Sequence, residues 1–238
     1  MDYDFSGKVA LITGAASGMG KLTGENIIAA GGKVIALDIT PIEETDSLCY
    51  ANCDVRVYAQ LEAAAKKGIE RFGRIDFLCN FAGGDGIRIL HGVRDFATVD
   101  PAILEWEIDV NLRAQMMAAR AVIPYMIEQK SGVILNVGSV AGLKASGGAI
   151  GYSSAKAGAI FGLTKSLAKY GGPHGIRVNC ISPGPVLTRA AMANMKTLLG
   201  RAAEPQEIVD RVMYLLSDKS SFCTGSNFTI DGGHCVMY

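Results

Sequence analysis

The stretch Lys8-Val-Ala-Leu-Ile-Thr-Gly-Ala-Ala-Ser-Gly-Met-Gly20 joins an apolar run to a glycine-rich loop. Its first part, Lys8 to Ile12, is a short apolar run with β-branched residues, which predicts a buried strand. The glycine loop from Thr13 to Gly20 follows directly, and a helical pattern continues from Lys21 to Ala30. Strand, glycine turn and helix in this order direct backbone N–H groups and the positive end of a helix dipole at a pyrophosphate. The stretch therefore predicts a nucleotide site.

A second apolar run, Lys33-Val-Ile-Ala-Leu37, ends in Asp38, which lies about 20 residues beyond the glycine loop. A carboxylate at this place accepts hydrogen bonds from the adenosine ribose hydroxyls and repels a 2′-phosphate. Glycines alone mark any tight strand-to-helix turn, and their spacing here, Gly-x-x-x-Gly-x-Gly, differs from the general Gly-x-Gly-x-x-Gly pattern. It is therefore Asp38 that favours a dinucleotide.

The segment Tyr152-Ser-Ser-Ala-Lys156 predicts hydride-transfer chemistry. A tyrosine and a lysine four residues apart share one face of a helix, so the ammonium can favour the ionised phenol. This help is needed because free tyrosine has a pKa of about 10 and is a poor base at neutral pH. Ser139, thirteen residues upstream, adds a hydroxyl that can donate to a substrate oxygen. A tyrosine and a lysine at this spacing are usually neighbours on a helix without a catalytic role. The presence of a nucleotide motif in the same chain supports a catalytic role here.

The arrangement of apolar runs predicts an α/β fold, a Rossmann-type doubly wound parallel sheet of about seven strands with helices on both faces, in a single domain over residues 1–238. In such sheets ligands bind beyond the carboxyl ends of the strands. Only nine residues separate Asp38 from Leu48, so we expect an abbreviated helix there. The predicted strands lie near residues 8–12, 33–38, 48–53, 75–79, 132–137, 176–181 and 226–230.

Composition excludes several classes of protein. The chain has 238 residues, 49% of them hydrophobic, and a formal net charge of zero. It has no basic block that would bind nucleic acid, and its apolar stretches are far shorter than the ~20 residues of a membrane span. The acidic start Met1-Asp-Tyr-Asp is unlike a signal peptide, so we predict a cytoplasmic protein. The six cysteines and three histidines show no metal-binding spacing, so no metal is predicted and the thiols are expected to be reduced.

These motifs resemble those of the short-chain dehydrogenase/reductase family, in its compact single-domain branch, over nearly the whole chain. Thr13 to Gly20 is similar to the family's Thr-Gly-x-x-x-Gly-x-Gly, and Ser182-Pro-Gly-Pro-Val-Leu-Thr188 to its turn that holds the nicotinamide carboxamide. Asn80-Phe-Ala-Gly83 resembles its Asn-Asn-Ala-Gly, except that Phe81 replaces an asparagine of mainly structural role. The resemblance implies a catalytic tetrad of Asn111, Ser139, Tyr152 and Lys156, with the asparagine supporting a water relay behind the lysine.

Motifs and resemblance together predict NAD as the cofactor, preferred over NADP. Asp38 supports this preference, as does Ser17, because it occupies a loop position where phosphate-preferring members often carry a basic residue. Lys21 and Lys33 are nearby, but we interpret them as solvated surface charges. The predicted cofactor contacts are Gly14, Ser17, Gly18, Met19, Gly20, Asp38, Ile39, Asp54, Val55, Asn80, Ala82, Gly83, Tyr152, Lys156, Pro183, Gly184, Val186 and Thr188.

Two segments are expected to face the substrate, residues 84–97 and a short apolar lid at about 187–200. Four basic residues in or near these segments could bind a carboxylate or a phosphate, but we interpret each of them as a solvated surface charge. They are Arg88, Arg94, Lys144 and Arg189. The C-terminal helix from Pro205 to Leu216 and the strand after it resemble the surfaces through which this family forms homodimers and homotetramers.

The resulting hypothesis is an NAD(H)-dependent oxidoreductase that interconverts a secondary alcohol and a ketone, with Tyr152 as the general acid/base. Its substrate is expected to be a small or cyclic, mainly apolar molecule. Two alternatives stay open: an NADPH-dependent 3-oxoacyl reductase with the same motifs, and a protein that senses NAD(H) without chemistry. The intact tyrosine and lysine argue against the sensor, and Asp38 argues against the reductase.

Overall fold

The protein is described from a computed structural model, which covers residues 3–144, 146–188 and 190–237. Within these residues seven strands form one sheet in the order β3-β2-β1-β4-β5-β6-β7, and all pairings are parallel. This confirms the predicted α/β Rossmann-type fold. The strands are β1 (Val9–Thr13), β2 (Lys33–Asp38), β3 (Leu48–Asn52), β4 (Phe77–Asn80), β5 (Gly132–Val137), β6 (Ile176–Pro183) and β7 (Asn227–Ile230).

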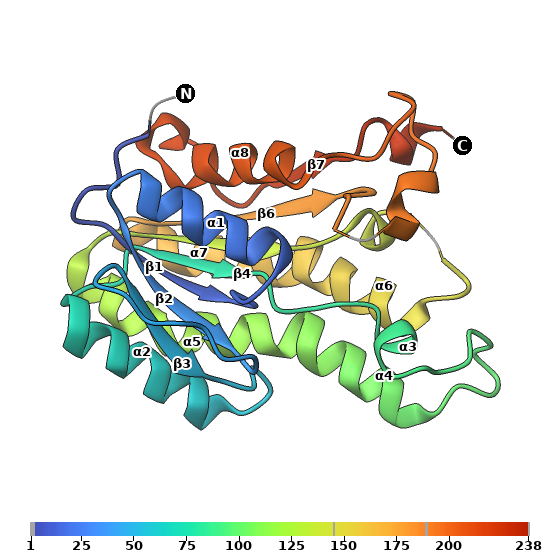
Figure 1. The fold of residues 1–238 in the computed structure, drawn as a ribbon, viewed down its shortest axis with the longest axis horizontal. Helices are drawn as coiled ribbons and strands as arrows, with labels where there is room; N and C mark the ends of the chain where they lie inside the picture. The colour runs from blue at the N-terminus through green and yellow to red at the C-terminus, as the bar shows by residue number, and fades with distance from the viewer. Residues whose placement is uncertain (1–2, 145, 189, 238) are drawn as a thin grey trace.

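Helices cover both faces of the sheet, as predicted (Figure 1). Helices α1 and α8 pack on one face, and α2, α5 and α7 pack on the other. Three further helices, α3, α4 and α6, lie toward the end of the molecule where the strands end (Figure 1). The bounds are α1 (Gly18–Ala29), α2 (Tyr58–Phe72), α3 (Gly86–Ile89), α4 (Pro101–Ile108), α5 (Ala114–Gln129), α6 (Ile150–Ala157), α7 (Thr164–Gly171) and α8 (Pro205–Leu216).

The strands are buried on both faces, which explains why they read as continuous apolar runs. Side chains of a strand alternate between the faces, so Leu11 of β1 packs with the α2 and α5 side, whereas its neighbour Ile12 packs with α1 and α8. Both leucine and isoleucine here are at most 1% exposed. The two hydrophobic cores, one on each face of the sheet, fix the positions of the strands and therefore of their carboxyl ends.

Two helices are extended by π-helical turns at places that matter for the site. Helix α4 runs through a π-helical turn at Asp109–Arg113 into α5, and α6 runs through another at Gly158–Leu163 into α7. Such turns occur frequently at functional sites because the extra residue re-aims the side chains around it. Here the first turn contains Asn111 and the second begins two residues after Lys156.

The expectation of an abbreviated helix between β2 and β3 is wrong. Residues 39–47 contain bends and a bridge between Thr45 and Leu48, and no helix. The connection is attached to α2 by side chains instead, since Glu44 pairs with Lys67 and Arg71. Adjacent parallel strands can thus be joined by a short crossover when ion pairs replace the packing that a helix would provide.

The edge of the sheet opposite the strand ends is held by a buried carboxylate. Asp76 is 2% exposed and accepts from the backbone N–H of Val9 at 3.0 Å. Arg74 also donates to it twice, at 2.8 and 2.7 Å, and Lys8 lies at 3.3 Å. One acidic side chain therefore joins the start of β1 to the segment that enters β4.

We predict that Asp76→Ala lowers the free energy of unfolding by about 2 kcal/mol, because it leaves a buried N–H and a guanidinium without their partner. Urea unfolding followed by circular dichroism measures this change. Glu70→Ala, which removes an exposed pair with Lys66, is the control and should change stability little. NADH affinity should be unchanged in both variants, since Asp76 lies at the far edge of the sheet; equal stability of the two variants would contradict the prediction.

Candidate active site

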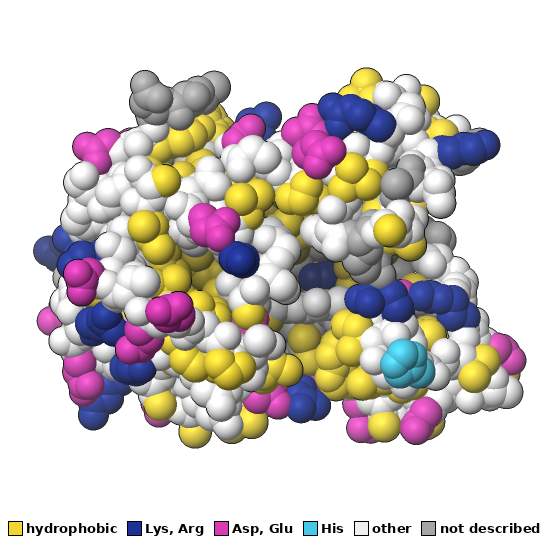
Figure 2. All heavy atoms as spheres, viewed as in Figure 1, with side chains coloured by type: hydrophobic (Ala, Val, Ile, Leu, Met, Phe, Trp, Pro, Cys, Tyr) yellow, Lys and Arg dark blue, Asp and Glu magenta, His cyan; other side chains and the backbone are white. Residues whose placement is uncertain are grey.

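The predicted site residues meet in one cleft at the carboxyl ends of the strands. Its volume is about 780 Å³. The space-filling view shows a hollow next to the part of the molecule that contains α3 and α4, which lies at the lower right (Figure 2). All predicted catalytic and cofactor residues line it except Asn80 and Asn111. Asn80 is buried behind the cleft, where its side chain donates to Asn136 at 3.0 Å, so its contact with cofactor is still only a prediction.

The glycine loop has the close backbone approach that a dinucleotide site requires. Gly14 and Gly18 have φ values of +69° and +54°, which residues other than glycine rarely adopt. A Cβ on Gly14 would lie 2.7 Å from the backbone nitrogen of Ala82, and one on Gly20 would lie 2.2 Å from the Gly14 oxygen. The first turn of α1 contains no acidic residue. Its N–H groups are thus suited to a pyrophosphate, and the residues present fit the predicted cofactor.

Asp38 is oriented by the backbone on both sides. One carboxylate oxygen accepts from the N–H of Ala16 in the glycine loop at 3.0 Å, and the other accepts from the N–H of Thr40 at 2.9 Å. Next to it, Ile39 is 70% exposed and lines the same end of the cleft. A carboxylate and an exposed apolar side chain are thus placed side by side, as a ribose and an adenine would need.

Arg56 is a cleft residue that the sequence analysis did not find. Its guanidinium donates to both oxygens of Asp54, at distances from 2.6 to 3.1 Å. This pairing lowers the pKa of the Asp54 carboxyl through its hydrogen bonds. The positive charge at this end of the cleft is therefore already offset by Asp54.

Lys156 is buried next to Tyr152. Helix α6 places both on one face, with the ammonium nitrogen 5.7 Å from the centre of the tyrosine ring. Lys156 is 3% exposed and donates to the carbonyl of Val137, at the end of β5, at 2.8 Å. Burial lowers the pKa of this lysine from 10.5 to about 8. The ammonium of Lys156 is therefore closer to losing its proton at neutral pH than an exposed lysine would be.

Asn111 is fully buried and holds the segment after β4. Its Oδ1 accepts from the N–H of Gly84 and its Nδ2 donates to the carbonyl of the same residue, both at 2.9 Å. A Cβ on Gly83 would lie 2.7 Å from Asn111 Oδ1 and 3.3 Å from Lys156 Nζ. Gly83 is thus packed closely against both Asn111 and Lys156.

Ser139 directly follows Gly138 at the end of β5 and lines the cleft. Its Oγ accepts from the N–H of Ala141 at 3.1 Å and so begins the short 3₁₀ turn at Val140–Gly142. Because the oxygen is the acceptor in this bond, the hydroxyl hydrogen remains for a substrate oxygen. The arrangement can therefore orient a hydroxyl or carbonyl group next to Tyr152.

Glu107 is a second residue that the sequence analysis missed. Its carboxyl group is fully buried, and Oε1 accepts from the N–H of Gly86 at the start of α3 at 2.9 Å. A Cβ on Gly151 would lie 2.4 Å from Oε2, so the carboxyl group also touches the start of α6. Burial raises its pKa. Its place four residues before Asn111, on the same helix face, is the signal that could have revealed it.

Among the known protein families, the short chain dehydrogenases match residues 8–198 of this chain. The chain belongs to the short-chain dehydrogenase family. It is therefore an oxidoreductase that acts on CH–OH groups with a nicotinamide cofactor.

Relatives of this short-chain dehydrogenase cover nearly its whole length. A 3-alpha-(or 20-beta)-hydroxysteroid dehydrogenase of Mycobacterium tuberculosis is 39% identical, over 95% of this chain and 89% of the relative. A 3-oxoacyl-acyl-carrier-protein reductase of Thermotoga maritima is 36% identical over 95% and 97%, and a trans-4-hydroxycyclohexanecarboxylate dehydrogenase of Sinomonas cyclohexanicum is 36% identical over 95% and 92%. The crystal structure of levodione reductase, 31% identical, superposes with a TM-score of 0.88 over 98% of this chain and all of that one.

The described residues of this short-chain dehydrogenase form neither a metal centre nor a membrane-spanning helix. No group of three or more His, Cys, Asp or Glu side chains in the described part of the chain is arranged to hold a metal ion. No described helix combines the length and apolar character needed to cross a membrane. All six cysteines are free thiols, four of them buried. The predicted surface charge Arg189 lies outside the described residues.

We predict that the pKa of Lys156 makes stability depend on pH. Between about pH 8 and 10.5 the unfolded chain keeps the lysine proton that the native protein has released, so the unfolded state binds more protons and stability rises with pH. Relative to Lys156→Met, the wild-type protein without cofactor should gain about 2 kcal/mol in free energy of unfolding between pH 7 and 9.5.

Urea titrations of both proteins at several pH values measure this gain, and titrations of groups that do not interact with Lys156 cancel because both proteins contain them. A constant difference between the two proteins over this range would show that the buried lysine keeps an ordinary pKa.

Proposed function

We propose that this chain is an NAD(H)-dependent dehydrogenase that interconverts a secondary alcohol and a ketone on a small or cyclic, mainly apolar substrate. The observation that carries the proposal is the convergence of Tyr152, Ser139 and Lys156 in the cleft that also contains Asp38. A tyrosine beside a buried ammonium can exchange a proton with an alcohol oxygen, and a nearby hydroxyl can donate a hydrogen bond to that oxygen.

In the oxidative direction Tyr152 removes the hydroxyl proton while Ser139 donates a hydrogen bond to the same oxygen. Lys156 stabilises the phenolate by its positive charge and is held in place by Val137. Asn111 acts behind them by fixing Gly84 and supporting proton exchange with solvent. NAD⁺ bound at the glycine loop and Asp38 would supply the acceptor for the hydride that leaves the carbon, so that the overall products are a ketone, NADH and a proton. Reduction of a ketone follows the same steps in reverse.

The proposed preference for NAD rests on Asp38 and Arg56. The carboxylate of Asp38 is fixed by two backbone N–H groups at the end of β2, where a 2′-phosphate would meet its negative charge. Arg56, a basic side chain at the same end of the cleft, is paired with the carboxylate of Asp54. A ribose with free hydroxyls is therefore the better match for this end of the cleft.

The choice of a ring alcohol is supported by the walls of the cleft and by the relatives. At the substrate end the lining includes Ile89, Trp106, Val140, Met192 and Met195. Relatives that cover almost the whole chain act, by their names, on hydroxysteroids and on a hydroxycyclohexanecarboxylate, which are ring alcohols. The 36% identity to a 3-oxoacyl reductase keeps that activity, with NADPH, as the second candidate.

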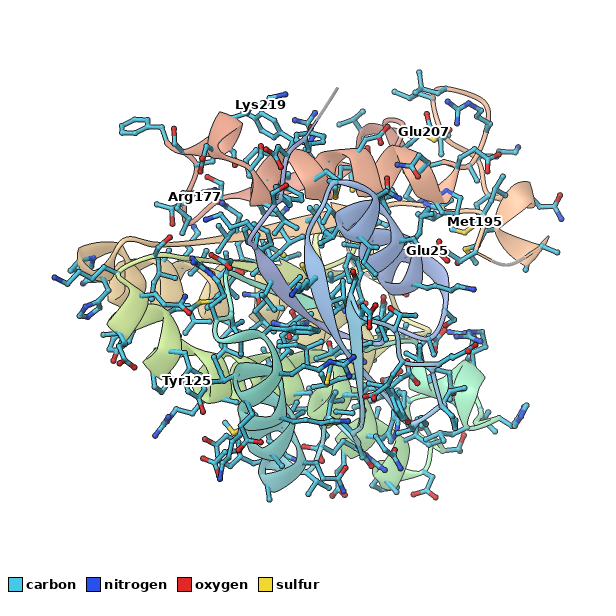
Figure 3. The ribbon with its side chains drawn as sticks, turned by 60° about the vertical axis from the view of Figure 1, so that its left-hand side comes forward. Glu25, Tyr125, Arg177, Met195, Glu207 and Lys219 are labelled. Atoms are coloured by element: carbon cyan, nitrogen blue, oxygen red, sulfur yellow. The ribbon has the colours of Figure 1, made fainter. Side chains whose placement is uncertain are left out.

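The segment of residues 187–200 is proposed as the substrate lid. Met192 and Met195 line the cleft, while Leu198 and Leu199 are 61% and 71% exposed. Met195 lies at the same end of the molecule as Glu207, and Arg177 and Lys219 lie at the other end (Figure 3). Exposed leucines on a segment next to a cleft provide apolar surface that closure over a substrate would bury.

We further infer that the enzyme works in the cytosol as a homodimer or homotetramer. The edge strand β7 and helix α8 form the surfaces that family members use for assembly, and Phe222, close to them in sequence, is fully exposed. Burial of such an apolar side chain against a second copy is favourable.

We predict that Tyr152→Phe lowers kcat by at least 1,000-fold, on the order expected for loss of a general acid/base, and leaves the affinity for NADH nearly unchanged. Turnover is measured at 340 nm with a panel of secondary alcohols, including hydroxysteroids and cyclohexanols, and binding by NADH fluorescence. Tyr170→Phe, an exposed tyrosine of α7, is the matched control and should behave as wild type. Retained turnover in Tyr152→Phe would refute the assigned role; tight NADH binding with no turnover of any alcohol by the wild type would favour a sensor.

We predict that Asp38→Ser raises the ratio of kcat/KM with NADP⁺ to that with NAD⁺ by about 10- to 100-fold, because a negative charge and a ribose acceptor are both removed. Asp46→Asn removes a charge from an exposed residue of the same β2 to β3 connection and serves as control. A wild-type enzyme that already prefers NADP⁺ would contradict the proposed cofactor and favour the 3-oxoacyl reductase.

A further inference from the structure

Arg88 is a cleft residue whose positive charge has no ion-pair partner among the described residues. It lies on α3, is exposed, and is part of the cleft lining. Its backbone N–H donates to Asp85, but its guanidinium lies within 4.0 Å of no described carboxylate. An arginine presents five donors in a planar fork, so this one reaches the cleft with its charge-assisted hydrogen bonds unused.

Three other described basic side chains near the substrate end already have hydrogen-bond partners within the protein. Arg94 pairs with Asp85 and also donates to the carbonyl of Gly148 at 2.9 Å. Lys144 donates to the carbonyl of His234 at 3.1 Å, and Lys156 donates to that of Val137. In the space-filling view, Lys and Arg side chains lie along the lower rim of the hollow, near α3 (Figure 2). Of the charges at this rim, the Asp85 carboxylate offsets Arg94 and leaves Arg88 uncompensated.

The guanidinium of Arg88 is held close to the predicted catalytic residues through Gly84. A Cβ on Gly84 would lie 3.8 Å from Nη2 of Arg88. Both backbone groups of Gly84 are bound by Asn111, and the adjacent Gly83 lies against Lys156. The backbone that carries Arg88 is thus anchored to the same asparagine that supports the lysine.

The segment that follows is also attached to the helix of Tyr152. Arg94 connects Asp85 to Gly148, which lies two residues before α6. Glu107 touches the start of α3 and the start of α6. A group bound by Arg88 would therefore have a defined position relative to Tyr152.

We propose that the substrate of this enzyme carries a carboxylate, and that Arg88 binds it at the end of an otherwise apolar substrate pocket. The proposal rests on the proposed function and names its substrate class, a secondary alcohol with an apolar body and one carboxylate. A single guanidinium without a carboxylate partner matches a monoanion, whereas a phosphate dianion would need a second such positive charge, and the described residues of the rim supply none. Arginine binds a carboxylate by two parallel hydrogen bonds, which fixes orientation as well as charge.

The test compares two substrates of the same shape, trans-4-hydroxycyclohexanecarboxylate and its neutral carboxamide. The enzyme, with saturating NAD⁺, is expected to have a higher kcat/KM for the acid than for the amide. Arg88→Gln should lower kcat/KM for the acid about 10- to 100-fold, as for loss of charge-assisted hydrogen bonds, and change that for the amide less than about 3-fold. Arg88→Lys should recover part of the acid activity, because it keeps the charge without the fork.

Arg120→Gln, which removes an exposed arginine of α5, is the matched control and should leave the ratio of acid to amide unchanged. Inhibition by cyclohexanecarboxylate and by cyclohexanecarboxamide, or their binding to the enzyme–NADH complex by calorimetry, gives the same comparison if neither alcohol is turned over. Equal use and equal binding of acid and amide by the wild type would overturn the proposal, as would an equal loss of both activities in Arg88→Gln.

Different results would refute the role of Arg88 and the proposed dehydrogenase function. Turnover of neutral ring alcohols with no preference for the acid would refute the role of Arg88 and leave the proposed function intact. Absence of turnover with any secondary alcohol would refute the proposed function, whatever the acid and amide show in binding.

Discussion

Burial of the Lys156 ammonium at the end of β5 is the constraint on which the site depends. A charged group removed from water is costly unless its donors are used, and here the carbonyl of Val137 accepts one of them. That carbonyl also accepts from Gln115 of α5, so the end of the strand is held from both sides. The lysine can be buried only because the sheet and α5 already fix its acceptor, and the position of the lysine relative to Tyr152 follows from that.

The surroundings of this lysine are organised by polar groups that bridge separate elements. Asn111 binds both backbone groups of Gly84, and Glu107, one helical turn earlier, touches the starts of α3 and α6. These contacts join the loop after β4 to the helix of the tyrosine. Buried polar networks of this kind specify one arrangement because an unsatisfied member would be penalised. The substrate end of the cleft is consequently built on helices α4 and α6 and on the ends of β4 and β5.

The two ends of the cleft differ in which charged side chains have ion-pair partners. At the Asp38 end, Arg56 is paired with Asp54, and Asp38 is directed by backbone N–H groups. At the other end, Arg94 is paired with Asp85, but Arg88 has no such partner among the described residues. A ligand that spans the cleft would thus meet a carboxylate at one end and a guanidinium at the other. This polarity gives a long ligand a single preferred direction of binding.

Local spacing in the chain was enough to predict the seven strands, the glycine loop, the place of Asp38 and the pairing of Tyr152 with Lys156. The signals were apolar runs, a turn that only glycine allows, and a helical repeat of four. The tertiary structure was needed to show that the β2 to β3 connection has no helix, that the Asn80 side chain is buried against Asn136, and that Glu107 contacts α3 and α6. It also showed that Arg88, one of four basic residues considered from the sequence, lines the cleft without an ion-pair partner among the described residues. These depend on contacts between residues that are distant along the chain. Spacing within one segment says which face a side chain occupies; it does not say which other segment that face will meet.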